Sequence, residues 1–278
     1  MIIDVSPQQL QNAKKLCPSN YSIQIDKLSH DFFVNLAQSG LWPKAVNQHR
    51  IITNESEKQY RAKCILFDLL DFDLQDQRLL DFGCGDGHLV QEALKRGANA
   101  IGYDPNTTCD NDFITNDINI IEKNSKYNIL IMYDTIDHIL NNAYNIFIKI
   151  ANMVHKDGKI IIRTHPFTSI HGTHLYESLN LAYVHLFLTQ QQIIKLGGKP
   201  LDTLQLYNPE AFYEKMIFDA GTVLIDKKIV RTELPKFIDQ NDVLDYLLQV
   251  FALEGIDTRQ KLRNLLSIQF IDYYAMKL

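Results

Sequence analysis

The segment LLDFGCGDGHLV, residues 79–90, places Gly83, Gly85 and Gly87 directly behind an apolar run. Glycine weakens regular secondary structure, so this concentration indicates a place where the backbone must lie close to a ligand or turn sharply. The residues after the loop are typical of a helix, whose first turn offers unpaired N–H groups and a positive partial charge. Asp104 ends the next apolar segment and could accept hydrogen bonds from a ribose diol. We therefore expect a nucleoside-containing cofactor at the loop, with a tight structural turn as the alternative.

The spacing of the glycines separates two kinds of cofactor. A dinucleotide-binding loop reads G-x-G-x-x-G. This loop reads G-x-G-x-G and has His88 where a dinucleotide site would have its third glycine. Asp81 closes the strand just before the loop. In this form, LLDFGCGDG, the segment resembles the first motif of the class I S-adenosylmethionine-dependent methyltransferases.

Further motifs of that family follow in the same order. IGYDPN resembles its second-strand motif, ITNDI its third, YNILIMYDTIDHI its fourth, and VHKDGKIIIRT the turn into its fifth strand. In the fourth motif, Asp137-His138 stands where Glu-His is more usual. The resemblance covers residues 56–164 and implies S-adenosylmethionine as the cofactor. The cofactor-binding residues it implies are Asp81, Phe82, Gly83, Cys84, Gly85, Asp104, Pro105, Asp117, Ile118, Tyr133, Asp134 and His138.

Particular roles follow from the same resemblance. It implies that Asp104 binds the ribose and that Asp117 and Ile118 flank the adenine. We expect Cys84 to act through its backbone N–H rather than as a nucleophile.

Four histidines, His165, His171, His174 and His185, fall within the stretch that follows the fifth strand. In the implied architecture this stretch begins at the cofactor edge of the sheet, so it is expected to line the substrate pocket. Histidine titrates near neutral pH and can take a proton from an attacking nucleophile. We expect His165 or His171 to orient or deprotonate the substrate and His185 to be structural. A metal held by His171 and His174 is the alternative, but no carboxylate or cysteine nearby completes a clear ligand set, so no metal is expected.

The methyl acceptor is less directly marked in the sequence. The amino-methylating nucleic-acid branch of the family often carries (D/N)PP(Y/W) after the fourth strand, where this chain reads YDTIDH. The net charge is −5, and no basic run suggests binding to a phosphate backbone. We expect a small-molecule acceptor with an oxygen or nitrogen nucleophile. The alternatives are a protein or RNA methyltransferase, an NAD-dependent oxidoreductase, and a non-catalytic module that binds the cofactor.

The elements that must position these residues alternate along the chain. Apolar runs predict strands at 78–82, 100–104, 112–117, 127–134, 159–164, 222–230 and 267–276. Helical periodicity predicts helices within 22–39 and at 56–71, 87–97, 137–155 and 208–221, with one or two more in 241–264. This alternation predicts an α/β fold with a doubly wound, mostly parallel sheet. The resemblance implies seven strands of Rossmann-like methyltransferase type, the last of them antiparallel.

The sequence also predicts a division of the chain into segments and a cellular location. We expect an N-terminal helical cap over 1–55 and a methyltransferase domain over 56–278, with a substrate-side insertion at 166–207. Cys17, Cys64, Cys84 and Cys109 show no CxxC spacing, which favours reduced thiols over a zinc site or disulfides. Neither a signal peptide nor an apolar run of about 20 residues is evident. These features predict a cytoplasmic protein that does not enter a membrane.

Overall fold

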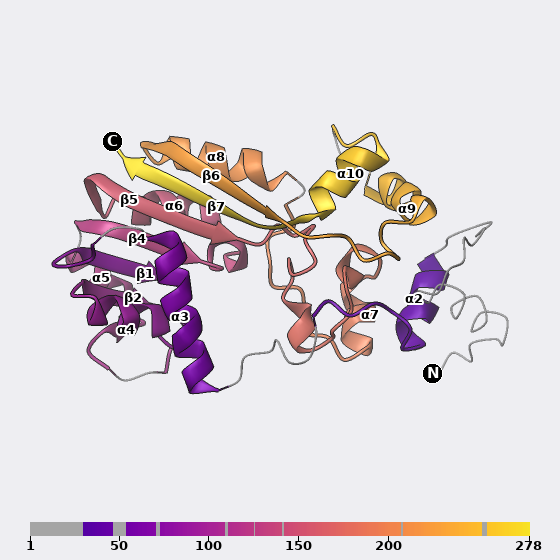
Figure 1. Cartoon of the computed structure of the whole chain (residues 1–278), viewed down its shortest axis with the longest axis horizontal. Coiled ribbons are helices and arrows are strands. Elements are labelled where there is room, and N and C mark those ends of the chain that lie inside the picture. The colour runs from indigo at the N-terminus through magenta and orange to yellow at the C-terminus, as the bar shows by residue number, and fades with distance from the viewer. Residues whose placement is uncertain are drawn as a thin grey trace. The chain divides into compact units, whose positions relative to one another are not determined.

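A computed structural model describes residues 30–46, 54–70, 73–108, 111–124, 126–140, 142–206, 208–251 and 255–278. The chain divides into two compact units, which we call the sheet unit and the helical unit. The sheet unit comprises residues 52–165, 208–229 and 270–278, and the helical unit comprises residues 1–51, 166–207 and 230–269 (Figure 1). Residues 230–269 therefore group with the cap and insertion segments rather than with the sheet. Cys17, Cys109 and the part of the predicted helix 22–39 before His30 lie outside the described residues.

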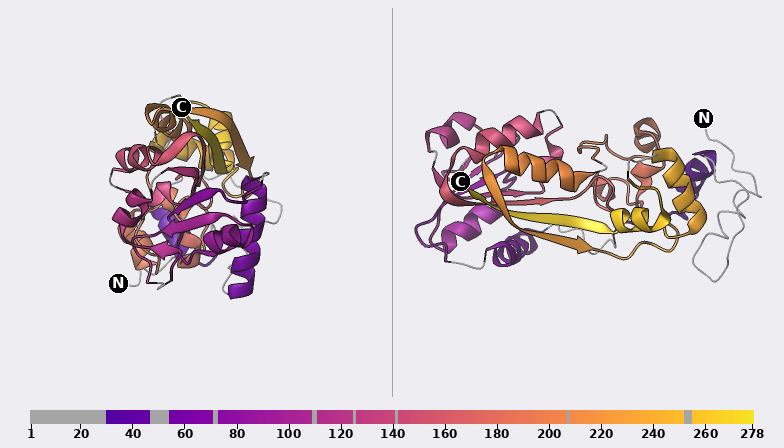
Figure 2. Two further views of the ribbon diagram at one scale, coloured as in Figure 1. Left: turned by 90° about the vertical axis from the view of Figure 1, so that its left-hand side faces the viewer. Right: turned by 90° about the horizontal axis from the view of Figure 1, so that it is seen from above.

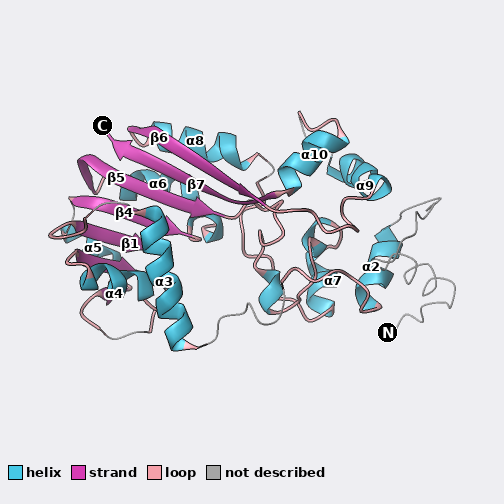
Figure 3. Cartoon of the chain, in the orientation of Figure 1, coloured by secondary structure: helices cyan, strands magenta, loops and turns pink. Residues whose placement is uncertain are grey.

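The sheet has seven strands in the order β3-β2-β1-β4-β5-β7-β6 (Figure 3). The strands are β1 (Arg78–Phe82), β2 (Asn99–Tyr103), β3 (Ile114–Thr115), β4 (Tyr127–Tyr133), β5 (Val154–Thr164), β6 (Thr222–Arg231) and β7 (Ile268–Lys277). β1 pairs in parallel with β2 and β4, β2 with β3, and β4 with β5. β7 pairs with β5 in the antiparallel direction. The predicted doubly wound, mostly parallel seven-stranded sheet is confirmed.

Helices cover both faces of this sheet. In the sheet unit they are α3 (Glu55–Leu69), α4 (His88–Lys95), α5 (Ile118–Lys123), α6 (Ala143–Ala151) and α8 (Pro209–Asp219). α3 packs against α4 on one face, and α6 packs against α8 on the other (Figure 2). Apolar residues of α3, α4, β1 and β4 form one continuous core. Because β1 to β5 are parallel, their carboxyl ends meet at one edge, where ligands of such sheets bind.

The helical unit has a separate core assembled from three distant segments. Its helices are α2 (His30–Gln38), α7 (Gln190–Lys195), α9 (Asn241–Phe251) and α10 (Arg259–Leu266), with short 3-10 turns η3 (Leu175–Glu177) and η4 (Val184–Leu186). Phe33, Trp42, Phe187 and Phe237 form an aromatic cluster with ring centroids 4.5–6.3 Å apart. The Trp42 indole N–H donates to the Ala182 carbonyl at 2.7 Å. No helix among the described residues combines the length and apolarity needed to span a bilayer.

Two elements differ from the sequence prediction near the end of β4. The helix predicted over 137–155 is wrong in its first part, because residues 136–138 form the 3-10 turn η2 (Ile136–His138) and α6 begins only at Ala143. Asn142 adopts a left-handed conformation with φ of 71°, which prevents continuous helix through this point. β5 begins at Val154 rather than at residue 159, since a register irregularity opposite Tyr127 and Ile129 accommodates the additional residues.

Three further elements differ from the sequence prediction. The third strand has only two residues, not the predicted six-residue span. The insertion contains α7, which was not predicted although Thr189 and Gln192 form a capping box at its start. The apolar stretch around His185 forms only the 3-10 turn η4 and not a longer helix.

Candidate functional site

The glycine loop, residues 83–87, connects β1 to α4, and all three glycines have positive φ, at 86°, 52° and 76°. A Cβ at Gly83 would lie 2.2 Å from Oγ1 and Cγ2 of Thr135, which follows β4. A Cβ at Gly87 would lie 2.2 Å from Cδ1 of Ile114. Nothing lies within 4 Å of the corresponding position at Gly85. Two of the glycines thus permit close packing of the loop, and Gly85 leaves open space beside the backbone.

The loop is tied to the carboxyl end of β2. The N–H groups of Gly83 and Cys84 donate to the Tyr103 carbonyl at 2.7 and 3.1 Å. The Gly85 N–H donates to Oδ2 of Asp104 at 3.0 Å. The Cys84 N–H, which we expected to face a ligand, is therefore engaged within the protein, and its sulfur lies 2.5 Å from a Cβ built on Gly102. Cys84 is a small residue that packs on β2.

Asp104 joins the loop to the turn after β2. Besides the Gly85 amide, its other carboxylate oxygen accepts from the Asn106 N–H at 2.8 Å. Pro105 is exposed in this turn. Each carboxylate oxygen has a second lone pair, so Asp104 retains acceptor capacity for the two hydroxyls of a ribose.

Asp81 points from the end of β1 and is 1 % exposed. Its Oδ2 has no hydrogen-bond partner among the described residues. Burial, reinforced by the charge of Asp104, raises the pKa of Asp81 to about 7. The neighbouring Phe82 ring stacks on Tyr103 at 4.9 Å. A buried carboxylate oxygen that has no hydrogen-bond partner in the described part of the chain, beside a glycine loop, favours a ligand that carries positive charge or N–H donors.

Asp117 and Ile118 mark the start of α5, directly after β3. The Asp117 side chain caps this helix by accepting from the Asn119 N–H at 2.9 Å. Its own N–H donates to Oγ1 of Thr115 at 3.0 Å. Asp117 is exposed and Ile118 is half-buried. Both residues therefore lie at the carboxyl end of β3, which is separated from β4 by β2 and β1 in the sheet.

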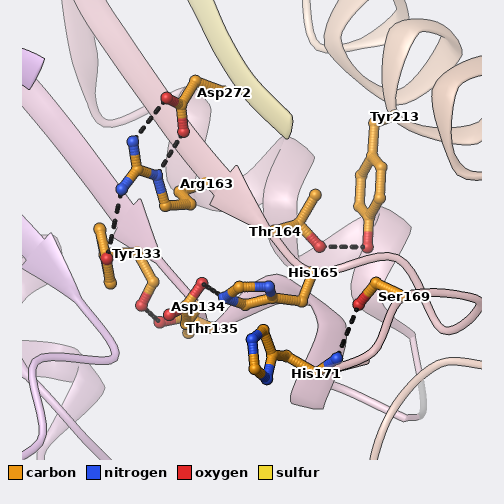
Figure 4. Close-up of polar contacts among 10 residues, drawn as sticks. All are labelled: Tyr133, Asp134, Thr135, Arg163, Thr164, His165, Ser169, His171, Tyr213 and Asp272. Atoms are coloured by element: carbon orange, nitrogen blue, oxygen red, sulfur yellow. Dashed lines mark hydrogen bonds and ion pairs between the residues drawn. The ribbon is translucent and has the colours of Figure 1, made fainter. Parts of the chain in front are cut away.

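A second group of polar residues lies where β4 and β5 end, and it pairs Asp134 with His165 (Figure 4). Asp134 has a φ of 50°, and its N–H donates to the Arg163 carbonyl at 3.0 Å. Its Oδ1 lies 3.3 Å from Nε2 of His165, and the two side chains are only 14 % and 13 % exposed. The His165 ring meets Phe270 edge-on at 5.9 Å. A largely buried histidine oriented by a carboxylate is able to accept a proton from a substrate.

Asp137 lies one turn beyond Asp134, in η2, and was not among the predicted site residues. It is 1 % exposed, and neither carboxylate oxygen has a hydrogen-bond partner among the described residues. Burial and then the charge of Asp134 raise the pKa of Asp137 to about 6, while His138 and His165 act in the opposite direction. The D-x-x-D-H spacing of residues 134–138 is the sequence signal that could have marked it.

An ion pair buried in the sheet supports this region. The Arg163 guanidinium donates to both carboxylate oxygens of Asp272, with N–O distances of 2.5 and 2.6 Å (Figure 4). It also donates to the Tyr133 hydroxyl at 3.3 Å and lies 3.9 Å from the centroid of Phe270. Tyr133, expected at the cofactor, is thus held by Arg163. At the end of β5, the Thr164 hydroxyl donates a hydrogen bond to the Tyr213 hydroxyl at 3.1 Å.

The remaining histidines of the insertion belong to the helical unit. The His171 N–H donates to Oγ of Ser169 at 3.2 Å (Figure 4), and its ring meets Tyr176 edge-on at 5.4 Å. Nε2 of His185 lies 2.7 Å from the Phe167 carbonyl, to which it donates. Burial lowers the pKa of His185 to about 4, so this histidine is neutral and has a structural role. Of the two histidines expected to act on the substrate, His165 lies in the sheet unit and His171 in the helical unit.

Comparisons with known proteins identify one family and several similar solved structures. A methyltransferase domain family matches residues 54–196, just over half of the chain. Solved structures of similar fold include an S-adenosylmethionine-dependent methyltransferase from Archaeoglobus fulgidus, with 18 % identity, a TM-score of 0.48, and coverage of 79 % of this chain and 94 % of the other. Another is magnesium protoporphyrin IX methyltransferase from Synechocystis PCC 6803 with bound S-adenosylhomocysteine, with 14 % identity, a TM-score of 0.46, and coverage of 82 % and 89 %.

A third similar structure is a putative methyltransferase from Haloferax volcanii in complex with the Trm112 methyltransferase activator, with 9 % identity, a TM-score of 0.43, and coverage of 80 % and 90 %. No curated protein matches the sequence. The family match extends from α3 through the glycine loop, β4 and β5 into the insertion. On this match, which covers more than half of its residues, the chain belongs to the methyltransferase domain family.

Proposed function

We propose that this chain transfers a methyl group from S-adenosylmethionine, held at the carboxyl edge of β1, β2 and β4, to an oxygen or nitrogen nucleophile of a small molecule. The observation that carries the proposal is the meeting, in one unit, of an open glycine loop, the Asp104 carboxylate and the Asp134–His165 pair. The loop and Asp104 supply a cofactor site, and the pair supplies a proton acceptor at the ends of the adjacent strands.

The residues of the sheet unit fit the chemical groups of the cofactor. S-adenosylmethionine supplies a methyl group already activated by a sulfonium centre. Asp104 would bind the ribose hydroxyls, and Asp117 and Ile118 would contact the adenine. The unpartnered Oδ2 of Asp81 would accept from the cofactor's ammonium group, since an opposite charge relieves the cost of a buried carboxylate. The open space beside Gly85 leaves room for the cofactor against the backbone.

His165 is the proposed catalytic residue, and Asp134 is its positioning residue. A neutral imidazole takes the proton that the acceptor loses, and the Asp134 carboxylate stabilises the imidazolium that forms. Much of the rate enhancement comes from holding the nucleophile in line with the methyl group, so modest acid–base assistance is sufficient. His171 remains a second candidate for orienting the acceptor.

The alternatives fit the site less well. His88 stands where a dinucleotide site requires glycine, and it is the first residue of α4. Its Nε2 lies 2.7 Å from Oε1 of Glu55. A glycine there allows close packing of a dinucleotide loop, which His88 does not permit. An RNA acceptor is disfavoured by the net charge of −5 and the lack of a basic run. A non-catalytic module would have no use for the Asp134–His165 pair.

The test is the thermal unfolding of the chain with S-adenosylhomocysteine and, separately, with NADH. A ligand present at 100 times its dissociation constant stabilises a fold by about 2.7 kcal/mol. We expect a clear rise in Tm with S-adenosylhomocysteine and none with NADH. Asp104→Ala should reduce the rise, whereas Asp68→Asn, at an exposed position of α3, should leave it unchanged. Stabilisation by NADH alone would refute the proposed cofactor site.

A further inference from the structure

Asp137 is a buried carboxylate that nothing in the proposed reaction yet uses. It lies in η2, between the end of β4 and α6, and both of its oxygens lack a hydrogen-bond partner among the described residues. A buried carboxylate normally accepts several hydrogen bonds, and leaving it without any is costly. Its position therefore indicates that a donor arrives from outside the chain.

The surroundings of Asp137 indicate where that donor would sit. Asp134 and His165 are paired nearby, and the charges of both act on Asp137. The charge of Asp137 also acts on the Tyr213 side chain. The Tyr213 hydroxyl accepts a hydrogen bond from Thr164, the last residue of β5. Because η2 follows β4 and contacts β5, Asp137 lies near the strand ends that carry the proposed catalytic histidine, and both residues belong to the sheet unit.

We propose that Asp137 binds the amino group of the methyl acceptor, so that the substrate is an amine and the chain is an N-methyltransferase. This inference rests on the proposed methyl-transfer function and narrows its acceptor. An ammonium group brings a positive charge and several N–H donors, and charge-assisted hydrogen bonds to a carboxylate are stronger than neutral ones. An alcohol brings one donor and no charge. A carboxylic acid would meet like charges at Asp134 and Asp137.

The reaction balances with residues already in place. The acceptor enters as R–NH₃⁺ against the Asp137 carboxylate and gives one proton to the neutral His165 imidazole. The freed nitrogen lone pair forms the new C–N bond while the bond between the methyl carbon and sulfur breaks, its electron pair remaining on sulfur. The products are S-adenosylhomocysteine and R–NH₂⁺–CH₃, which stays paired with Asp137 until it leaves. His165 then releases its proton to solvent.

A competing role for Asp137 is to bind the ammonium group of the cofactor itself. Asp81 fits that role better, because it is the next-to-last residue of the strand that leads into the glycine loop and its Oδ2 has no hydrogen-bond partner among the described residues. The two roles are separable by experiment, since Asp137 should then affect acceptor binding and leave cofactor binding alone.

The experiment compares wild type, Asp137→Asn and the exposed control Asp68→Asn. The affinity of each for S-adenosylhomocysteine is measured first by calorimetry. Each protein, saturated with S-adenosylhomocysteine, is then titrated by thermal unfolding with butylamine, butanol and butyrate, and with benzylamine, benzyl alcohol and benzoate. Asparagine keeps the size of the side chain and removes an unpaired buried charge, so the variant should fold. The selectivity of wild type among the three chemical classes is a second readout that needs no variant.

We expect all three proteins to bind S-adenosylhomocysteine alike. In wild type and Asp68→Asn, at least one amine should raise Tm more than its matched alcohol and acid, and Asp137→Asn should bind it roughly tenfold more weakly. Equal amine binding by wild type and Asp137→Asn overturns the inference, and so does the lack of any preference for amines in wild type. Loss of S-adenosylhomocysteine affinity in Asp137→Asn assigns Asp137 to the cofactor and also overturns it. If wild type itself does not bind S-adenosylhomocysteine, the proposed function fails rather than this inference alone.

Discussion

Replacing Asp81 by asparagine tests the reasoning about the buried carboxylate beside the glycine loop. In the folded protein the pKa of Asp81 is raised from 3.8 to about 7, first by burial and then by the charge of Asp104. A carboxyl with a raised pKa stabilises the fold while it is protonated. Its contribution is fully present below pH 3.8 and is lost as the pH rises through 7. The protein without cofactor should therefore become less stable between pH 4 and pH 8 because of this one group.

The size of the effect follows from the shift. Each pKa unit corresponds to about 1.4 kcal/mol, so a shift of roughly three units amounts to about 4 kcal/mol when the carboxylate is fully ionised. Asparagine has nearly the same shape and never ionises. Asp81→Asn should match wild type near pH 4 and exceed its free energy of unfolding by about 4 kcal/mol near pH 8.

Urea unfolding at pH 4 and pH 8 measures this difference, with Asp68→Asn as the exposed control. The control should follow the wild-type pH dependence. Asp81→Asn should also bind S-adenosylhomocysteine more weakly than wild type, because it lacks the carboxylate proposed to bind the ammonium group of the cofactor. A wild type and an Asp81→Asn variant with the same pH dependence would contradict the buried, unpartnered state of this carboxylate.

Three further predictions concern the fold around the sites. Gly83→Ala should destabilise the sheet unit by about 1–3 kcal/mol in urea unfolding, because φ is positive and the new Cβ would lie 2.2 Å from Thr135; stability equal to wild type would contradict the close approach. His185→Gln should flatten the acid side of the stability profile: the folded pKa of His185 is lowered from 6.5 to about 4, so its stabilisation is present above pH 6.5 and is lost as the pH falls toward 4, by about 3 kcal/mol. If His185→Gln loses stability below pH 6.5 as steeply as wild type, the proposed effect of burying a neutral His185 is wrong. Arg163→Met should cost about 3–5 kcal/mol by leaving the fully buried Asp272 carboxylate unpaired, and adding Asp272→Leu should recover part of that loss. If the double variant is no more stable than Arg163→Met, the loss does not come from the stranded charge.

The succession of elements was readable from the sequence because the signals for it are local. β1 has the predicted bounds, and β7 is shifted by one residue. Apolar runs and helical periodicity depend on neighbours within about two helical turns, so they survive without knowledge of the fold. The helix predicted over 137–155 was wrong for the same reason, since an apolar stripe can continue past a left-handed residue such as Asn142 that ends the helix in space.

The contact between the glycine loop and Asp104 was also predictable. The glycine loop and Asp104 belong to adjacent parallel strands, and their motif spacing fixes where they meet, as the hydrogen bond between Gly85 and Asp104 confirms. The partner of the Cys84 N–H was not predictable, because it depends on how closely the loop packs on β2.

By itself, the sequence determined the strand succession, the loop that ends β1 and the family to which they belong. Only the tertiary structure decided which side chains meet: Asp134 with His165 across two strand ends, and Arg163 with Asp272, 109 residues away. It also decided that Asp137 has no hydrogen-bond partner among the described residues, and that three separate segments share the core of the helical unit. These features depend on burial and on contacts between distant residues, which periodicity along the chain does not encode.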